Sequence, residues 1–183
     1  MKYLRRLLWF CTVRLFWLNV ISGILIMALY FSMNVTNILI LLEDGMAARA
    51  RVVLMHEDPG ELNKFFQQDF LDRDEALRIG QSAQSPYADY DIRGIDHRVS
   101  MEWMWSWPWE DTARADIVES VPAIDGKIKA SLRAAAIAEN EKRLYPPPWN
   151  TARYRATLVR IDGQWKIASL KLMETLPEAV TTP

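Results

Sequence analysis

The chain has 183 residues, a formal net charge of −1 and one cysteine, Cys11. A single cysteine excludes an intrachain disulfide, and a near-neutral balance makes the chain a poor candidate for nucleic-acid binding, which requires a concentrated basic face. The two histidines do not form a Cys/His cluster of the kind that holds structural zinc.

Residues 15–42 contain no Asp, Glu, Lys, Arg or His. As a helix they reach roughly 42 Å, against a membrane hydrocarbon core of about 30 Å. We therefore predict a transmembrane helix over residues 15–42, whose excess length tilts or emerges as a stalk. Only basic charges precede it, so the positive-inside bias places a tail, residues 1–14, in the cytoplasm and the rest of this single-pass chain outside the inner (cytoplasmic) membrane.

A cleaved signal peptide is the alternative interpretation of this N-terminus. MKYLRR would be its basic region, and Ala48-Arg49-Ala50 resembles a small-x-small cleavage site. Signal peptides carry an apolar region of about 7–15 residues, and the stretch found here is far longer, which favours the membrane anchor.

Residues 43–56 are predicted to connect the span to a soluble domain over residues 57–176. In that domain Asp58 is a good helix N-cap, Pro59 fits the first helical position and Glu61 completes a capping box. Large apolar residues follow at helical spacing as far as Leu71, and a second, shorter helix with Ala76 and Leu77 facing inward is expected to end at Gly80. A helix so rich in aromatic residues needs a broad apolar surface, most simply a sheet.

From Tyr87 onward, aromatic and branched residues predict one or two strands, with Gly94 marking a bulge or a bend. Residues 113–121 predict a further strand, and Asp125-Gly126 predicts a turn. The alanine-rich residues 127–143 are expected to be helical. The alternative is that residues 127–132 pair back on residues 117–124 before a helix begins.

The clearest predicted hairpin joins residues 153–161 to residues 164–173 through a two-residue type I′ turn at Asp162-Gly163. In that register Leu158 faces Ile167 and Arg160 faces Trp165. Residues 177–183 are expected to be a flexible tail. The predicted fold class is α+β: an N-terminal transmembrane helix followed by a helix packed on a curved antiparallel sheet.

Four tryptophans alternate along one stretch, which places them on one face of a strand, about 6.6 Å apart. They could stack on sugar rings, touch lipid headgroups or bind a protein partner. The preferred structural interpretation is that the row packs under the Phe-rich helix, with its last two members exposed where Pro108 ends the strand. The candidate binding residues are Trp103, Trp105, Trp107, Trp109 and, beside a proline run, Trp149.

No catalytic constellation is visible in the sequence. Asp96 and His97 are adjacent, so on a strand they face opposite ways and do not form a dyad. The chain contains no G-x-S-x-G and no G-x-G-x-x-G. We therefore expect no catalytic residues, no metal and no cofactor.

The segment YRATLVRIDGQWKIASLKL is similar to the closing hairpin of the nuclear-transport-factor-2-like superfamily. There a tyrosine-bearing strand, an Asp-Gly-type turn and a Trp-x-Ile strand end the domain, and these places are held here by Tyr154, Asp162, Gly163, Trp165 and Ile167. The resemblance implies a cone-shaped domain in which a helix packs on a curved sheet. Members range from isomerases to protein-binding modules, so fold alone does not choose a function.

The layout of tail, span and outer domain also resembles the bitopic inner-membrane scaffold of type IV secretion and conjugation machines, although the Asn-Pro-x-Gly turn of that family is missing. Our leading hypothesis is a non-enzymatic scaffold or binding module that contacts the membrane and another envelope protein or a second copy. The alternative is a small-ligand or glycan-binding or enzymatic pocket, which requires an open cavity lined by tryptophans and a buried carboxylate. A third hypothesis is a stalk that works only through its span.

Overall fold

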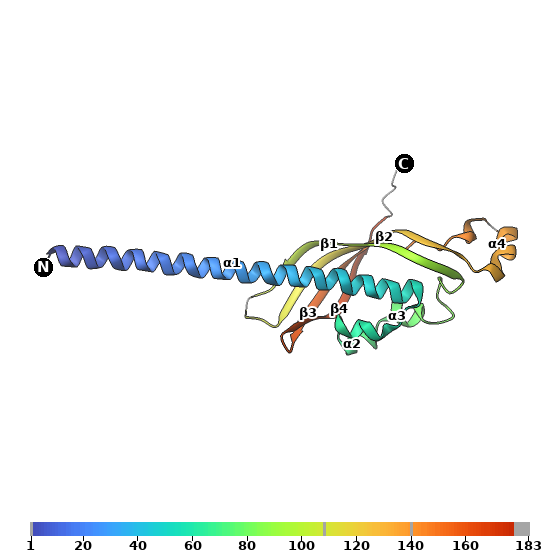
Figure 1. The fold of residues 1–183 in the computed structure, drawn as a ribbon, viewed down its shortest axis with the longest axis horizontal. Coiled ribbons are helices and arrows are strands. Elements are labelled where there is room, and N and C mark those ends of the chain that lie inside the picture. The colour runs from blue at the N-terminus through green and yellow to red at the C-terminus, as the bar shows by residue number, and fades with distance from the viewer. Residues whose placement is uncertain (1, 108, 140, 178–183) are drawn as a thin grey trace.

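The first element of the structure is a single long helix. The computed structural model describes residues 2–107, 109–139 and 141–177, and within them α1 runs from Lys2 to Met55, 54 residues (Figure 1). At 1.5 Å per residue this helix is about 81 Å long. Among the described residues it is the one helix long and apolar enough to span a membrane.

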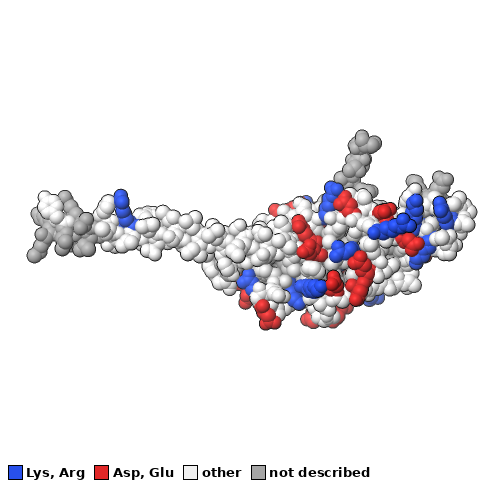
Figure 2. Space-filling model, viewed as in Figure 1, with Lys and Arg blue, Asp and Glu red and all other residues white. Residues whose placement is uncertain are grey.

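The two halves of α1 have different surroundings. Large apolar side chains between Trp9 and Met33 lie exposed, whereas Ile38, Leu42 and Met46 are 0% exposed in the core of the domain. Figure 2 shows the charged side chains gathered over the domain, while the stretch of α1 next to the domain, residues 15–42, is white and carries no charge. The apolar stretch therefore serves two purposes, with its first part projecting and its last part inside the domain.

The prediction that residues 43–56 form a connector is wrong. Residues 43–55 continue α1, and Val53 is buried in the same core cluster as Ile38 and Leu42. Steps of three and four residues place such positions on one helical face. The exposed charges of Glu43 and other residues on the opposite face interrupt the apolar run in the sequence, although the buried face continues through them.

Residues 59–80 form three short helical segments, η1 (Pro59–Lys64), α2 (Gln68–Leu71) and α3 (Glu75–Gly80), where a capped helix and a second, shorter helix were predicted. The last segment ends at Gly80, as expected. Asp58 is the N-cap as predicted, and its carboxylate accepts a bond of 3.0 Å from the Gly60 amide. The chain breaks between the segments because Gln67 donates its backbone N–H to Ile167, at the edge of the sheet. The helix expected to cover the sheet is thus replaced in that role by the end of α1.

Four antiparallel strands form the sheet in chain order: β1 (Tyr90–Trp105), β2 (Thr112–Ile128), β3 (Ala152–Ile161) and β4 (Gln164–Thr175). One face of this curved sheet lies against α1 (Figure 1). The β1–β2 connection and the β3–β4 turn both lie at the end of the sheet from which α1 projects (Figure 1). The predicted α+β fold class is confirmed.

The strand registers confirm the most local predictions. Leu158 pairs with Ile167 and Arg160 with Trp165. Asp162 and Gly163 have φ values of 51° and 80°, the positive values that a type I′ turn requires. The register of β1 shifts next to Gly94, where a bulge was expected.

The predicted turn at Asp125-Gly126 is wrong, because β2 continues through it to Ile128. Gly126 instead permits close approach between strands: a Cβ there would lie 2.9 Å from the Ile92 side chain of β1. Residues 127–132 do not pair back on residues 117–124. Helical structure follows in η2 (Ala130–Leu132), α4 (Arg133–Glu139) and η3 (Glu141–Leu144), which confirms part of the expected helix.

Candidate membrane-facing and partner-binding surfaces

Arg160 joins the β3–β4 hairpin to α1 at the point where the helix leaves the domain. Its Nη1 donates to the Tyr30 hydroxyl at 3.0 Å, and its Nη2 donates to Asn34 Oδ1 at 2.9 Å. The guanidinium also lies over the Trp165 ring, 4.4 Å from its centroid. These contacts hold the projecting helix at a defined angle to the sheet.

The predicted packing of the tryptophan row beneath a helix is wrong for Trp103 and Trp105, which are 49% and 46% exposed. The expected exposure of the last two members is confirmed, since Trp107 and Trp109 are 40% and 69% exposed. In this half of β1 the residues that pack against the core are Val99, Met101 and Met104 instead. The register shift between Met101 and Trp103 accounts for the difference, because a bulge changes which side chains face α1.

Three of these residues form one aromatic group, which we name the tryptophan cluster: Trp105, Trp107 and Trp109. The first two rings meet edge to face, with centroids 5.2 Å apart, and the last two stack, also at 5.2 Å. Phe31 of α1 lies 6.3 Å from Trp105, so the cluster continues directly from the projecting helix. The expected strand end at Pro108 lies outside the described residues; β1 ends at Trp105.

The other two candidate residues lie elsewhere. Trp103 pairs in register with Asp116 of β2 and takes no part in the cluster's ring contacts. Trp149 is half-buried against the core and stacks on Tyr87, with centroids 6.4 Å apart. Its part in binding stays a prediction, and its position gives it a packing role as well.

Buried polar residues lie between the helices and the sheet, and the sequence analysis missed them. Arg49 of α1 donates Nε and Nη2 to Asp74, at 2.6 and 3.0 Å. His97 Nε2 lies 3.0 Å from Oε1 of Glu119, which is fully buried in β2. Within the described part of the chain, Arg49 Nη1 and Glu119 Oε2 lack hydrogen-bond partners.

Burial and neighbouring charges shift the pKa values of residues in this buried polar region. Burial is the largest single effect on the pKa of Arg49 and lowers it, but the hydrogen bonds to Asp74 together with the negative charges of Asp74 and Glu119 leave that pKa above its ordinary value. Burial also raises the pKa of Tyr154, and the negative charge of Glu119 acts in the same direction. Arg49 contacts Asp74, and His97 contacts Glu119, between packed elements. These charged groups therefore have a structural role.

The cavity that the alternative hypothesis requires is not formed between α1 and the sheet by the described residues, because fully buried side chains such as Leu42, Ile117 and Leu158 fill that space. A pocket of about 330 Å³ lies at another place, beside η2 and η3. Its lining is charged and contains no tryptophan: Asp91, Arg93, Asp125, Lys127, Arg133 and Tyr145 are among its residues. No cluster of His, Cys, Asp or Glu within the described residues is placed to hold a metal ion.

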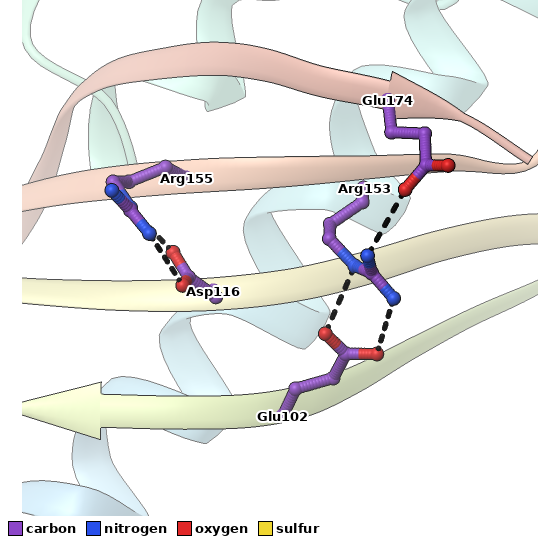
Figure 3. Close-up of polar contacts among 5 residues, drawn as sticks. All are labelled: Glu102, Asp116, Arg153, Arg155 and Glu174. Atoms are coloured by element: carbon purple, nitrogen blue, oxygen red, sulfur yellow. Dashed lines mark hydrogen bonds and ion pairs between the residues drawn. The ribbon is translucent and has the colours of Figure 1, made fainter.

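The outer face of the sheet carries ion pairs that cross neighbouring strands. Arg155 and Asp116 form two bonds of 2.7 and 2.8 Å, and Arg153 contacts both Glu102 and Glu174 at 3.0 Å (Figure 3). The helices lie behind the sheet in this view (Figure 3). Hydrogen bonds from Arg155 lower the pKa of the Asp116 carboxyl. On this face the opposite charges of the ion pairs balance one another, and none of the described helices covers the strands where these pairs lie.

Comparison of the structure with solved structures adds a similarity in fold. No protein-family model matches the chain, and no curated protein matches it. A crystal structure described as that of an NTF2-like protein from Cytophaga hutchinsonii is similar, with 14% identity over 71% of this chain and 93% of that chain and a TM-score of 0.35. Similarity at this level carries no argument about activity, so function must be argued from the residues of this chain.

Proposed function

We propose that this chain is a single-pass, membrane-anchored binding or scaffold module of a cell-envelope assembly. The observation that carries the proposal is the continuity of α1, which is apolar and exposed at one end and forms the core of the domain at the other. A helix built in this way fixes the domain to the membrane without a flexible linker. The excess of basic residues before the span supports a cytoplasmic N-terminus and an outer domain.

Partner binding is supported by the outer face of the sheet. Glu102, Asp116, Arg153 and Arg155 lie there in mutual ion pairs, and the exposed Trp103 pairs in register with Asp116. Tryptophan is enriched among the residues that dominate binding energy in protein interfaces. We propose that Trp103 contacts another envelope protein or a second copy of this chain.

Membrane attachment and orientation are tested with the full-length protein in cells. A Cys11→Ser, Lys127→Cys variant places the only thiol on the outer domain, and we expect a membrane-impermeant maleimide to label it in intact cells. Native Cys11 is the matched control and should react only after the cells are opened. Labelling of Lys127→Cys only after lysis would contradict the proposed orientation. Recovery of the protein in the soluble fraction without detergent would contradict the proposed membrane anchor.

Partner binding is tested by photo-crosslinking at the outer face. A photoreactive residue at position 103 should give one discrete crosslinked product, whereas the same residue at exposed position 129, beyond the end of β2, should not. Absence of the product at position 103 would contradict binding through this face. The stalk hypothesis is tested by replacing residues 15–29 with an unrelated apolar helix, because a longer exchange would also remove Tyr30, which bonds Arg160, and core residues such as Ile38. Function that is kept after this exchange would exclude a stalk that works only through its span.

A further inference from the structure

The membrane-facing end of the domain carries a second contact with lipid. We propose that the tryptophan cluster, Trp105, Trp107 and Trp109, docks on the headgroup layer of the membrane that α1 enters. This inference rests on the proposed membrane span and deepens it. The span alone fixes a helix in the bilayer, and the cluster would set how the domain rests on the membrane surface.

The height of the cluster along α1 follows from helix geometry. Twenty residues, starting at Leu15 just after Arg14, rise about 30 Å and reach Asn34, which matches the hydrocarbon thickness of a typical bilayer. The ring of Phe31, inside the last turn of this segment, lies 6.3 Å from Trp105. Trp105 is therefore at the outer boundary of the membrane when residues 15–34 cross it.

A second loop reaches the same level. Arg160 holds the β3–β4 hairpin to Tyr30 and Asn34, and its neighbour Ile161 is 42% exposed. The two connections at this end of the sheet thus lie near the emerging helix (Figure 1). The cluster and the hairpin provide separate points of contact, which is what a surface needs to define a tilt.

The chemistry of the cluster fits the interface between lipid and water. An indole ring combines an apolar body with one N–H donor, and tryptophan is enriched where the bilayer meets water. Stacking of Trp109 on Trp107 presents a continuous aromatic surface, with Trp109 the most exposed of the three. A protein partner for the same rings is the competing occupant, and the experiment below separates the two.

The charges around the cluster indicate zwitterionic headgroups. Three acidic residues lie near the cluster: Glu110 and Asp111, which directly follow Trp109, and Asp162 in the β3–β4 turn. Two basic residues, Arg114 and Arg160, also lie near it. An acidic surrounding gives no attraction to anionic lipid. A bilayer made only of phosphatidylcholine should therefore be sufficient for contact through the rings, and this contact should change little with salt concentration.

The test measures the depth of a nitroxide label in the full-length protein, embedded in phosphatidylcholine nanodiscs. In a Cys11→Ser background, Glu110→Cys places the label beside the cluster and leaves all three tryptophans in place. Ile26→Cys, in the exposed part of α1, reports the hydrocarbon, and Lys129→Cys reports water. We expect oxygen collisions, relative to collisions with a water-soluble nickel chelate, to be several-fold higher at position 110 than at position 129.

Combined replacement of the three cluster tryptophans by alanine should bring the label at position 110 to the value at position 129. Trp103→Ala is the matched control and should leave the depth unchanged. A label at position 110 that is in water while position 26 is in hydrocarbon would overturn the docking and leave the anchor intact. Position 26 in water would instead refute the span itself, and with it the docking.

An unchanged depth after cluster replacement would show that the rings do not make the contact, which also overturns the inference. A depth that is water-like in nanodiscs but protected in native membranes would assign the cluster to a protein partner. Addition of phosphatidylglycerol should leave the depth at position 110 the same. A requirement for the anionic lipid would contradict contact through the rings.

Discussion

The buried pair between Arg49 and Asp74 gives the most quantitative prediction for the domain. Both side chains are almost fully enclosed, 7% and 6% exposed, and the pair links α1 to α3. Replacing Arg49 by methionine keeps most of its volume but leaves the Asp74 carboxylate buried without a countercharge. Breaking a buried pair on one side costs about 3–5 kcal/mol, so we expect a loss of that size in the free energy of unfolding.

Asp74 has a second role, because its Oδ1 also accepts from the Ala76 amide as the N-cap of α3. Asp74→Ala should therefore lose about 1 kcal/mol more than Asp74→Asn, which keeps a capping oxygen. The double variant Arg49→Met, Asp74→Asn removes both charges. It should be more stable than either single charge variant, because no unpaired charge stays buried.

The assay is urea unfolding of the full-length protein in detergent micelles, followed by the near-ultraviolet circular dichroism of buried aromatic residues such as Trp165. The exposed pair of Glu61 and Lys64 is the control, and Lys64→Met should leave the unfolding midpoint unchanged. An Arg49→Met variant within about 0.5 kcal/mol of the wild type would refute the reasoning, because surface substitutions have effects of that size.

Three further predictions use the same unfolding assay. Leu42→Ala should cost about 2–5 kcal/mol as a core truncation, whereas Leu29→Ala, in the exposed part of α1, should cost the soluble domain nothing; equal effects would contradict the division of α1. Gly80→Ala should destabilise by about 1–3 kcal/mol, because its Cβ would lie 2.9 Å from the α1 backbone; an unchanged midpoint would mean that α3 packs more loosely. Arg155 lowers the folded-state pKa of Asp116, so the stability from this pair is present above the ordinary pKa of 3.8 and is lost as pH falls through the lower folded value. Asp116→Asn should flatten that acid dependence, and an unaltered pH profile would contradict the pairing.

The sequence predicted best those elements whose structure is decided by neighbouring residues. The Asp162-Gly163 turn fixed the register of β3 and β4, because only a two-residue turn with positive φ joins them without splaying the strands. The Asp58 cap was found for the same reason, since an N-cap bonds an amide two or three residues away. Gly94 marked its bulge through its lack of a side chain.

Features that depend on distant contacts were missed or misplaced. The end of α1 was taken for a connector because charges lie on its outer face, although Ile38, Leu42 and Met46 follow each other at four-residue steps and indicate a buried stripe. The tryptophan row was assigned to the core because its alternation predicts a shared face without saying which face that is. A bulge placed it outside.

The buried polar residues were hidden for a related reason. Arg49 and Asp74 are 25 positions apart, and His97 and Glu119 are 22 apart, on elements that meet only in the folded domain. Within one sequence each of them is an ordinary surface charge. Arg49 gave one usable signal, since it continues the buried steps of α1 between Met46 and Val53.

In the membrane-anchored arrangement that we propose, the shared helix also decides how the domain can be released. A protease that cuts at Glu43, where the charge-free stretch ends, would remove Ile38 and Leu42 from beneath the sheet and shed an unfolded product. A cut before Asn34 would free a domain whose interior is complete. Shedding of an intact ectodomain therefore requires cleavage in the helical turns nearest the lipid, and a recombinant soluble fragment should begin there too.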